Sequence, residues 1–300
     1  MTFETPHTVA IIGGSGEISE PFNSGLLERG IRLRILARHP ERVCKRYPAA
    51  TVVPGSMTNT DDVAGAMEGA NAALLTTPIS PRNDPRAEVD SARPTIEAAR
   101  RAGLPHLIFI SCIEIDHPTG VALLDAKKTI EEMLAESGIP WTSIRCGSYM
   151  EDVIDTRVGA IRAGHFVLPV KPDLPFHYTA QKDVPRLVCE LLGRDLQLNG
   201  SVAFVTPETY TPRDAANIMT RYAGRRVRPT GRWLFCVLLL ALPIFWLLRH
   251  RFSTIFHLIS HFNREGYVAR SRSIADLMPD FRMTSLEEHL HDLLAQPKPR

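Results

Sequence analysis

A glycine-rich turn near the N-terminus carries the clearest chemical signal in the sequence. It follows the apolar run 8–12, precedes a helical pattern, and consists of Gly13, Gly14, Ser15, Gly16, Glu17 and Ile18. Glycine lets the backbone approach a pyrophosphate, whose charge is met by the N–H groups and the positive dipole end at the start of a helix. Such a turn can also be a tight strand-to-helix connection without a ligand. Its position between strand and helix favours a nucleotide-binding site.

The end of the second predicted strand, 33–37, indicates which nucleotide would bind. An acid at this place accepts a hydrogen bond from the ribose of NAD, whereas a cation meets the 2′-phosphate of NADP. Here the strand is followed by Arg38, and then by Arg42. A guanidinium offers a planar fork that suits phosphate, although both arginines can also be solvated loop charges. The sequence therefore predicts NADP(H) as the cofactor.

Alternating strands and helices would position these residues. Short apolar runs predict strands at 8–12, 33–37, 51–53, 72–75, 107–111 and 141–145. The connecting segments read as helices, one capped at Thr60 and one, 86–102, interrupted by Pro94. Parallel strands need crossover connections, which are usually helices. We therefore expect an α/β fold with a doubly wound parallel sheet, a Rossmann domain over residues 1–150.

The second half of the chain has a mixed pattern. Prolines mark a loop at 169–175, and the sequence predicts a helix at 182–192, a strand at 201–205 and a helix at 213–222. This pattern favours a smaller C-terminal α/β domain over residues 151–300.

The overall composition excludes several classes of protein. The 300 residues are 44% hydrophobic and 23% charged, which is typical of a globular chain. The 35 basic and 33 acidic side chains are too balanced for a nucleic-acid-binding surface, so no nucleic-acid partner is expected. Five scattered cysteines form no C-x-x-C pair and the histidines lack ligand spacing, so we expect no metal. The N-terminus does not resemble a secretory signal, which favours a cytoplasmic location.

One segment, 233–248, reads WLFCVLLLALPIFWLL and carries no charge. A bilayer span needs about twenty apolar residues, and this run is shorter and contains Pro243. Tryptophans near both ends and flanking arginines suit a membrane surface. Three interpretations remain open: a packed part of the substrate domain, a peripheral membrane anchor, or a full span.

Several longer motifs resemble the NmrA-like branch of the atypical short-chain dehydrogenase/reductases. Among them are VAIIGGSGEIS, LARHPERV, IEAARRAGLPHLIFIS, KKTIEEMLAESGIPWTSIRCGSYMED and the late REGYVA. The resemblance covers nearly the whole chain and implies a Rossmann domain for NADP(H) and a small C-terminal substrate domain. Through the motif GSMTNTDDVAGAMEGANAALLTTP it also assigns to the cofactor site Thr76, Thr77 and Pro78.

Two positions depart from the family pattern. Ser19 stands where the last glycine of the turn is expected, and because that glycine permits close helix–strand packing, the helix is expected to move outward slightly. Ser56 replaces an aspartate near the adenine, whereas Met57 is still expected to cover the ring.

The resemblance also implies catalytic residues. It places the superfamily lysine at Lys127 and the serine at Ser111, but Leu123 stands where the Y-x-x-x-K pattern has tyrosine, and leucine has no transferable proton. Lys127 would bond the nicotinamide ribose, act as the acid itself, or be a solvated helix residue. Tyr149, after the strand 141–145, would supply a hydroxyl or simply pack.

Two functions follow from these features. One is an NADP(H)-dependent reductase of a small apolar carbonyl, quinone or enone, associated with a membrane surface or wholly cytoplasmic. The other is a non-catalytic NADPH-sensing regulator that acts through protein contacts, which requires different affinities for two conformations. Leu123 favours the sensor, and the apolar segment 233–248 favours an enzyme with a lipophilic substrate.

Overall fold

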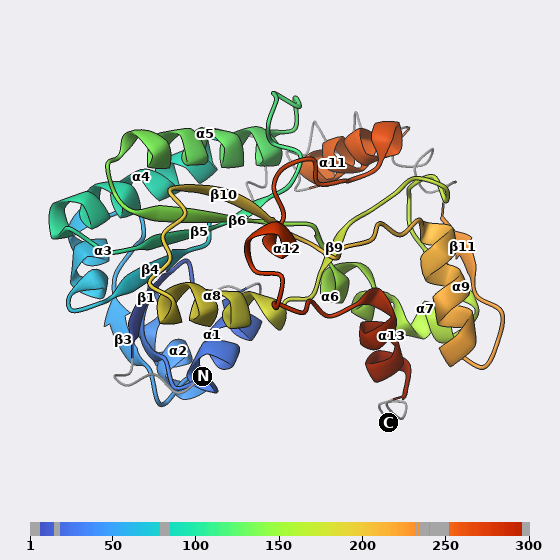
Figure 1. Ribbon diagram of the computed structural model, residues 1–300, viewed down its shortest axis with the longest axis horizontal. Coiled ribbons are helices and arrows are strands. Elements are labelled where there is room, and N and C mark those ends of the chain that lie inside the picture. Colours follow the sequence, from blue (N-terminus) through green and yellow to red (C-terminus); the bar gives the residue numbers. More distant parts are fainter. Residues whose placement is uncertain are drawn as a thin grey trace.

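The computed structural model describes residues 7–14, 19–78, 85–231, 233, 240 and 252–295. A parallel sheet with helices on both faces forms one part of the molecule, and shorter elements of the C-terminal half gather beyond one end of it (Figure 1).

A seven-stranded sheet in the order β10-β6-β5-β4-β1-β2-β3 is the central layer. All of its neighbouring strands run parallel. β1 lies inside the sheet, where it pairs with β2 on one side and with β4 on the other. The order of the strands therefore reverses beside β1. A ligand in such a sheet binds outside the carboxyl ends of the strands at this switch point. The strands are β1 (Thr8–Ile12), β2 (Arg32–Ala37), β3 (Thr51–Pro54), β4 (Ala72–Leu75), β5 (Leu107–Cys112), β6 (Trp141–Cys146) and β10 (Gly200–Phe204).

The strands are apolar on both sides because helices cover both faces. In β1, Val9 and Ile11 pack into one core and Ala10 and Ile12 into the other. The first core lies under α1 (Glu20–Leu27), α2 (Pro40–Arg46) and α8 (Asp183–Gly193). The second lies under α3 (Thr60–Met67), α4 (Pro85–Ala102) and α5 (Ala122–Glu136) (Figure 1).

Two details of the helices differ from the sequence prediction. Asn59, and not Thr60, caps α3, since its side chain accepts hydrogen bonds from the backbone N–H groups of Asp61 and Asp62. Pro94 lies inside α4, an 18-residue helix that is not interrupted at the proline. The apolar face of α4 is buried against the sheet, and this packing offsets the hydrogen bond that proline removes.

The strand expected at 201–205 belongs to the main sheet and not to the C-terminal domain, which corrects the prediction. It is β10, which pairs along its length with β6. In the same layer, α8 packs against α1. The sheet and its helices therefore draw on residues from both sides of position 150.

The remaining elements surround a third apolar core, which includes Phe166, Tyr178 and Tyr267. Two short parallel pairs, β8–β11 and β7–β9, lie in this part. Its elements are β7 (Ser148–Tyr149), α6 (Met150–Val153), a 3-10 turn (Asp155–Arg157), α7 (Val158–Arg162), β8 (His165–Val167), β9 (Tyr178–Thr179), α9 (Pro212–Tyr222), β11 (Arg228–Thr230), α11 (Phe252–Glu265), α12 (Ile274–Leu277) and α13 (Leu286–Ala295).

Most of the apolar segment 233–248 lies outside the described residues. Within it, Trp233 and Leu240 are described, and their exposed fractions are 65% and 82%. Among the described residues, no helix has the length and apolar character that crossing a membrane requires.

Candidate functional site

The turn after β1 runs tightly against its neighbours because it lacks side chains. Gly13 has φ +86°, and a Cβ there would lie 2.0 Å from the carbonyl oxygen of Thr76. A Cβ on Gly14 would lie 2.2 Å from Cγ2 of Ile11. Only glycine fits both positions. The rest of the predicted turn, residues 15–18 with Ser15, Gly16, Glu17 and Ile18, lies outside the described residues.

Ser19 has a defined role at the start of α1. Its Oγ donates to the carbonyl oxygen of Gly13 (3.0 Å) and lies 3.2 Å from Oγ1 of Thr76, while the residue is only 2% exposed. Asn23, one turn later, donates to the carbonyl oxygen of Gly14 at 2.9 Å. The serine therefore ties α1 to the turn and to the end of β4.

The far end of the site lies over β2 and β3. Arg38 and Arg42 are both exposed and, among the described residues, neither makes an ion pair. The backbone N–H of Ser56 donates to a carboxylate oxygen of Asp62 at 2.8 Å. Met57 is half-buried against the core under α3. Arg38 is thus a cation directly after β2 that no carboxylate of the described residues neutralises.

Lys127 lies in a buried polar network at the ends of β4 and β5. Its Nζ is 2.8 Å from Oε1 of Glu88, and it donates to Oγ1 of Thr77 (2.6 Å) and to the carbonyl oxygen of Ile110 (3.3 Å). The side chain of Lys127 is 10% exposed and that of Glu88 is 1% exposed. Lys127 is therefore not a solvated helix residue. Pro78, the next residue after Thr77, is exposed.

The network limits what Lys127 can do. An ammonium group has three N–H donors, and all three have protein acceptors, so a ribose hydroxyl would have to replace one of them. Glu88, which sequence analysis does not single out, makes the arrangement possible because a buried charge needs a partner. Its position held a signal, since it lies on the buried side of α4 with Ala92, Thr95 and Ala99.

The two other predicted catalytic residues lie on different elements, β5 and β7. Ser111 is the second-last residue of β5, is 4% exposed, and its Oγ has no hydrogen-bond partner among the described residues. Tyr149 packs its ring 6.2 Å from that of Phe22, in the core under α1. Burial raises the pKa of Tyr149 well above 10, and the nearby Cys146 raises it further. Lys127, in contrast, lies over the ring of Phe109 in the opposite core, so the structure does not bring Tyr149 to Lys127.

A second polar pair lies just beyond β5 and has no local sequence signal. Oε2 of Glu114 is 3.2 Å from Nε2 of His261, although the two residues are 147 positions apart. Oε1 of Glu114 accepts a hydrogen bond from the backbone N–H of Val268 at 3.2 Å. Only the fold brings α11 to this end of the sheet.

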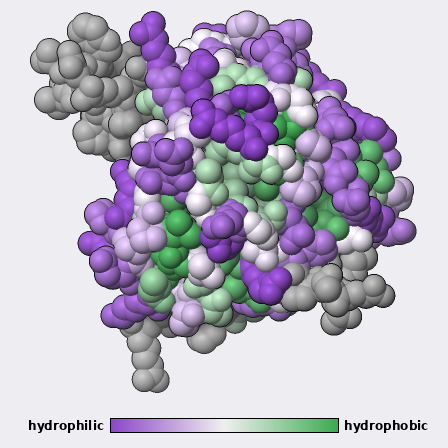
Figure 2. All heavy atoms as spheres, turned by 90° about the vertical axis from the view of Figure 1, so that its left-hand side faces the viewer, coloured by the Kyte–Doolittle hydropathy of each residue, from purple (hydrophilic) through white to green (hydrophobic). Residues whose placement is uncertain are grey.

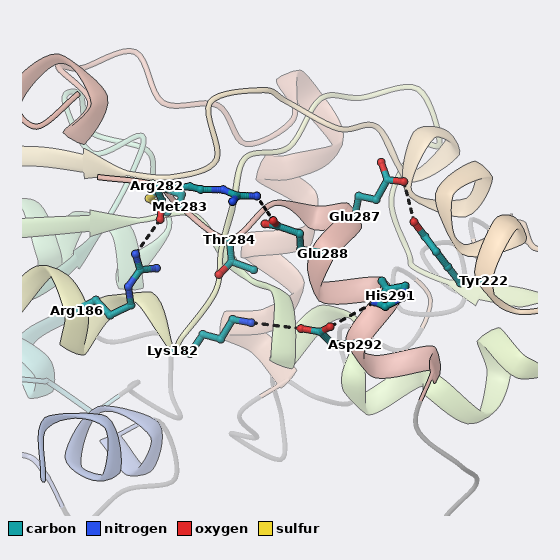
Figure 3. A pocket seen from close by; sticks show the side chains of 10 residues that line it. All are labelled: Lys182, Arg186, Tyr222, Arg282, Met283, Thr284, Glu287, Glu288, His291 and Asp292. Carbon is teal, nitrogen blue, oxygen red and sulfur yellow. Dashed lines mark hydrogen bonds and ion pairs between the residues drawn. The ribbon is translucent and has the colours of Figure 1, made fainter. Parts of the chain in front are cut away.

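Two cavities lie elsewhere. One of about 510 Å³ lies between α8 and α13 (Figure 3). Its basic residues Lys182 and Arg282 are paired with Asp292 and Glu288. Another, of about 450 Å³, is lined by mostly small or apolar residues at the ends of α3 and α4 and in the loops that follow them. It belongs to the end of the molecule seen in Figure 2, where apolar side chains lie among polar ones. Neither cavity contains the residues of the β4–β5 edge.

The strand order, the switch point beside β1 and the glycine turn together define a Rossmann-type α/β protein. The model of the NmrA-like family matches residues 5–288, and the chain belongs to this family.

Three known proteins are similar to this chain, one in sequence and two in fold. A (4-alkanoyl-5-oxo-2,5-dihydrofuran-3-yl)methyl phosphate reductase from Streptomyces griseus is 28% identical over 221 residues, 73% of this chain and 75% of that protein. The NADPH-dependent quinone oxidoreductase of Escherichia coli, solved with NADPH, is 19% identical with a TM-score of 0.77, covering 95% of this chain and 99% of that chain. NmrA, a negative transcriptional regulator solved with NAD, is 17% identical with a TM-score of 0.72, covering 97% and 96%.

Proposed function

We propose that the protein is an NADP(H)-dependent reductase of a small apolar carbonyl, quinone or enone. The observation that carries this proposal is the gathering of Thr77, Lys127 and Ser111 at the carboxyl ends of β4 and β5, beside the turn that follows β1. In doubly wound sheets the dinucleotide binds at this edge. The nicotinamide half would lie over β4 and β5, next to these three side chains.

The residues present fit a bound dinucleotide phosphate. Gly13 and Gly14 keep the turn tight, as Rossmann turns do when they bring a helix start to a pyrophosphate. Arg38 is exposed and lacks an ion pair among the described residues, so its guanidinium is free for a 2′-phosphate. When bound, the reduced cofactor supplies a hydride. The buried hydroxyl of Ser111 has no hydrogen-bond partner among the described residues, so it can form a hydrogen bond at the same edge.

The relatives support the substrate class. The Streptomyces griseus protein is named for the reduction of a furanone and the Escherichia coli enzyme for quinones, and both kinds of compound contain carbonyl groups. A cytoplasmic enzyme that touches a membrane surface through 233–248 would meet lipophilic members of this class. The exposure of Trp233 and Leu240 supports that contact.

An NADPH sensor is the second candidate. Leu123, at the position of the superfamily tyrosine, is packed among apolar side chains and offers no proton. A regulator, NmrA, shares the fold. In a sensor, bound NADPH would shift a conformational equilibrium that a partner protein reads.

Two measurements separate these functions. Fluorescence titration of the purified protein with NADPH and NADH tests the site. The oxidation of NADPH is then followed with a naphthoquinone, an α,β-unsaturated ketone and an unsaturated lactone. Turnover supports the reductase, tight NADPH binding without turnover supports the sensor, and the absence of binding refutes both.

A further inference from the structure

The position of the missing tyrosine lies beside α11. Leu123 and Leu258 of α11 both pack against the apolar cluster that contains Val121 and Leu124. Figure 1 shows α11 beside the end of α5 at which these residues lie. Residues three apart on a helix share a face, so His261 lies one turn from a side chain that packs on the same cluster as Leu123. The helix that carries the imidazole therefore contacts the end of α5 where a hydroxyl is absent.

Glu114 holds this imidazole with an unusual backbone conformation. Its φ is +59°, one of three positive values among the described non-glycine residues. A bulky residue adopts this region only when the surrounding contacts enforce it, and such residues cluster at functional sites. The enforcing contacts are the hydrogen bonds of its carboxylate with His261 and with the N–H of Val268.

The segment that carries Val268 is itself fixed. Tyr267 donates its N–H to the carbonyl oxygen of Pro175 and accepts from the N–H of His177, both at 2.9 Å. The N–H of Ala269 donates to Nδ1 of His177 at 2.9 Å. The backbone around Val268 thus holds Glu114 through a hydrogen bond, and Glu114 in turn contacts His261.

Other proton donors near this edge are less available. Tyr149 is half-buried, with its ring packed beside Phe22 and its hydroxyl beside the thiol of Cys146, and its pKa is raised well above 10. Each N–H of Lys127 already has an acceptor. Tyr267 is only 4% exposed and lies beside the thiol of Cys112. The side chain of His261 is 21% exposed, and its Nδ1 has no hydrogen-bond partner among the described residues.

We propose that His261 is the proton donor of the reductase and that Glu114 is its positioning residue; this inference rests on the proposed function. Hydride from the reduced nicotinamide dinucleotide forms a C–H bond at the carbonyl carbon, and the electron pair of the C=O π bond moves to oxygen. That oxygen takes the proton from Nδ1 of the imidazolium. The substrate gains two hydrogens, the cofactor is oxidised, and the neutral imidazole takes its next proton from water.

The variant His261→Gln tests the donor. Glutamine keeps a hydrogen bond to Glu114 but carries no titratable proton. Because general acid catalysis contributes about 10²- to 10⁴-fold, we expect kcat with an α,β-unsaturated ketone or an aldehyde to fall at least about 100-fold, with unchanged NADPH affinity. His257→Gln, one turn earlier on α11, is the matched control and should leave kcat unchanged.

A second pair of variants tests Glu114 as a positioning residue. Glu114→Ala removes the carboxylate that contacts Nε2 of His261 and accepts from the N–H of Val268, so kcat should fall while NADPH affinity stays unchanged. Glu114→Gln keeps an oxygen that accepts a hydrogen bond from the imidazole and should restore most of kcat. A merely structural Glu114 would lower Tm and NADPH affinity together with kcat.

The outcomes distinguish the two proposals. Loss of turnover in His261→Gln, with NADPH binding and melting temperature intact, supports the donor role. If His261→Gln turns over at the wild-type rate, the donor is another group and the reductase proposal stands. If the wild type binds NADPH but reduces none of the carbonyl compounds, both proposals are overturned.

Discussion

The ion pair between Glu88 and Lys127 gives a sharp test of how the site is held. The change is Glu88→Gln, which keeps the shape and an acceptor but removes the charge. Glu88 is 1% exposed and the side chain of Lys127 is 10% exposed, so the ammonium would be left buried without a counter-charge. Breaking such a pair from one side costs about 3–5 kcal/mol of the free energy of unfolding. For a chain of this length that corresponds to a fall in Tm of about 5–8 °C.

The assay is urea unfolding and thermal melting followed by circular dichroism. The double variant Glu88→Leu/Lys127→Met, which removes both charges with apolar groups of similar size, should recover most of the loss. Glu97→Gln, on the same helix, is the control, because its ion pairs with Arg100 and Arg101 are exposed and worth little.

Two results would refute this reasoning. One is a Glu88→Gln variant whose free energy of unfolding lies within about 1 kcal/mol of wild type, since a buried, uncompensated ammonium cannot cost so little. The other is additivity, in which the double variant loses as much free energy of unfolding as the single variants Glu88→Leu and Lys127→Met lose together. Either result would mean that water or another group neutralises Lys127.

Four further predictions concern the site, the core and the apolar segment 233–248. Arg38→Ala should weaken NADPH binding and leave NADH binding unchanged in a fluorescence titration, because only NADPH carries the 2′-phosphate. Gly13→Val should abolish NADPH binding and lower Tm, because a Cβ would lie 2.0 Å from a carbonyl oxygen at φ +86°. Burial lowers the pKa of His106 to about 4 from 6.5, so the unfolded chain takes up a proton that the folded chain does not; stability should therefore fall by roughly 3 kcal/mol as pH drops from about 6.5 to 4, and less in His106→Gln. Membranes from expressing cells should release the protein, at least in part, on carbonate or high-salt washing if 233–248 is a peripheral anchor.

Much of the fold could be predicted because its signals are local. The strands from β1 to β6 are short apolar runs between helical patterns, and the helix caps differ from prediction by a single residue at α3. The place of β10 could not be predicted in this way. Its register with β6 depends on pairing across more than fifty residues, which no pattern within the strand encodes.

The site shows the same division between local and distant information. Ser111 and Lys127 are predicted through the family resemblance, and Glu88 could have been predicted as an acid on the buried face of an amphipathic helix. The sequence gives Tyr149 a catalytic role only as one alternative, because it lies in the loop after β6. The direction of its side chain, into the core beside Phe22, depends on tertiary packing.

In the proposed reductase, binding and proton transfer would rest on different parts of the chain. Arg38, Thr77 and Lys127 belong to the sheet and its helices, whereas His261 belongs to α11 and is joined to the end of β5 by Glu114. Because Leu258 of α11 packs on the same apolar cluster as Leu123, the position of α11 decides both what lies beside that cluster and where the imidazole lies. A reductase that lacks the tyrosine of its superfamily can in this way obtain its proton from the C-terminal half, and a relative that keeps the sheet but changes α11 would still bind the dinucleotide without turning it over.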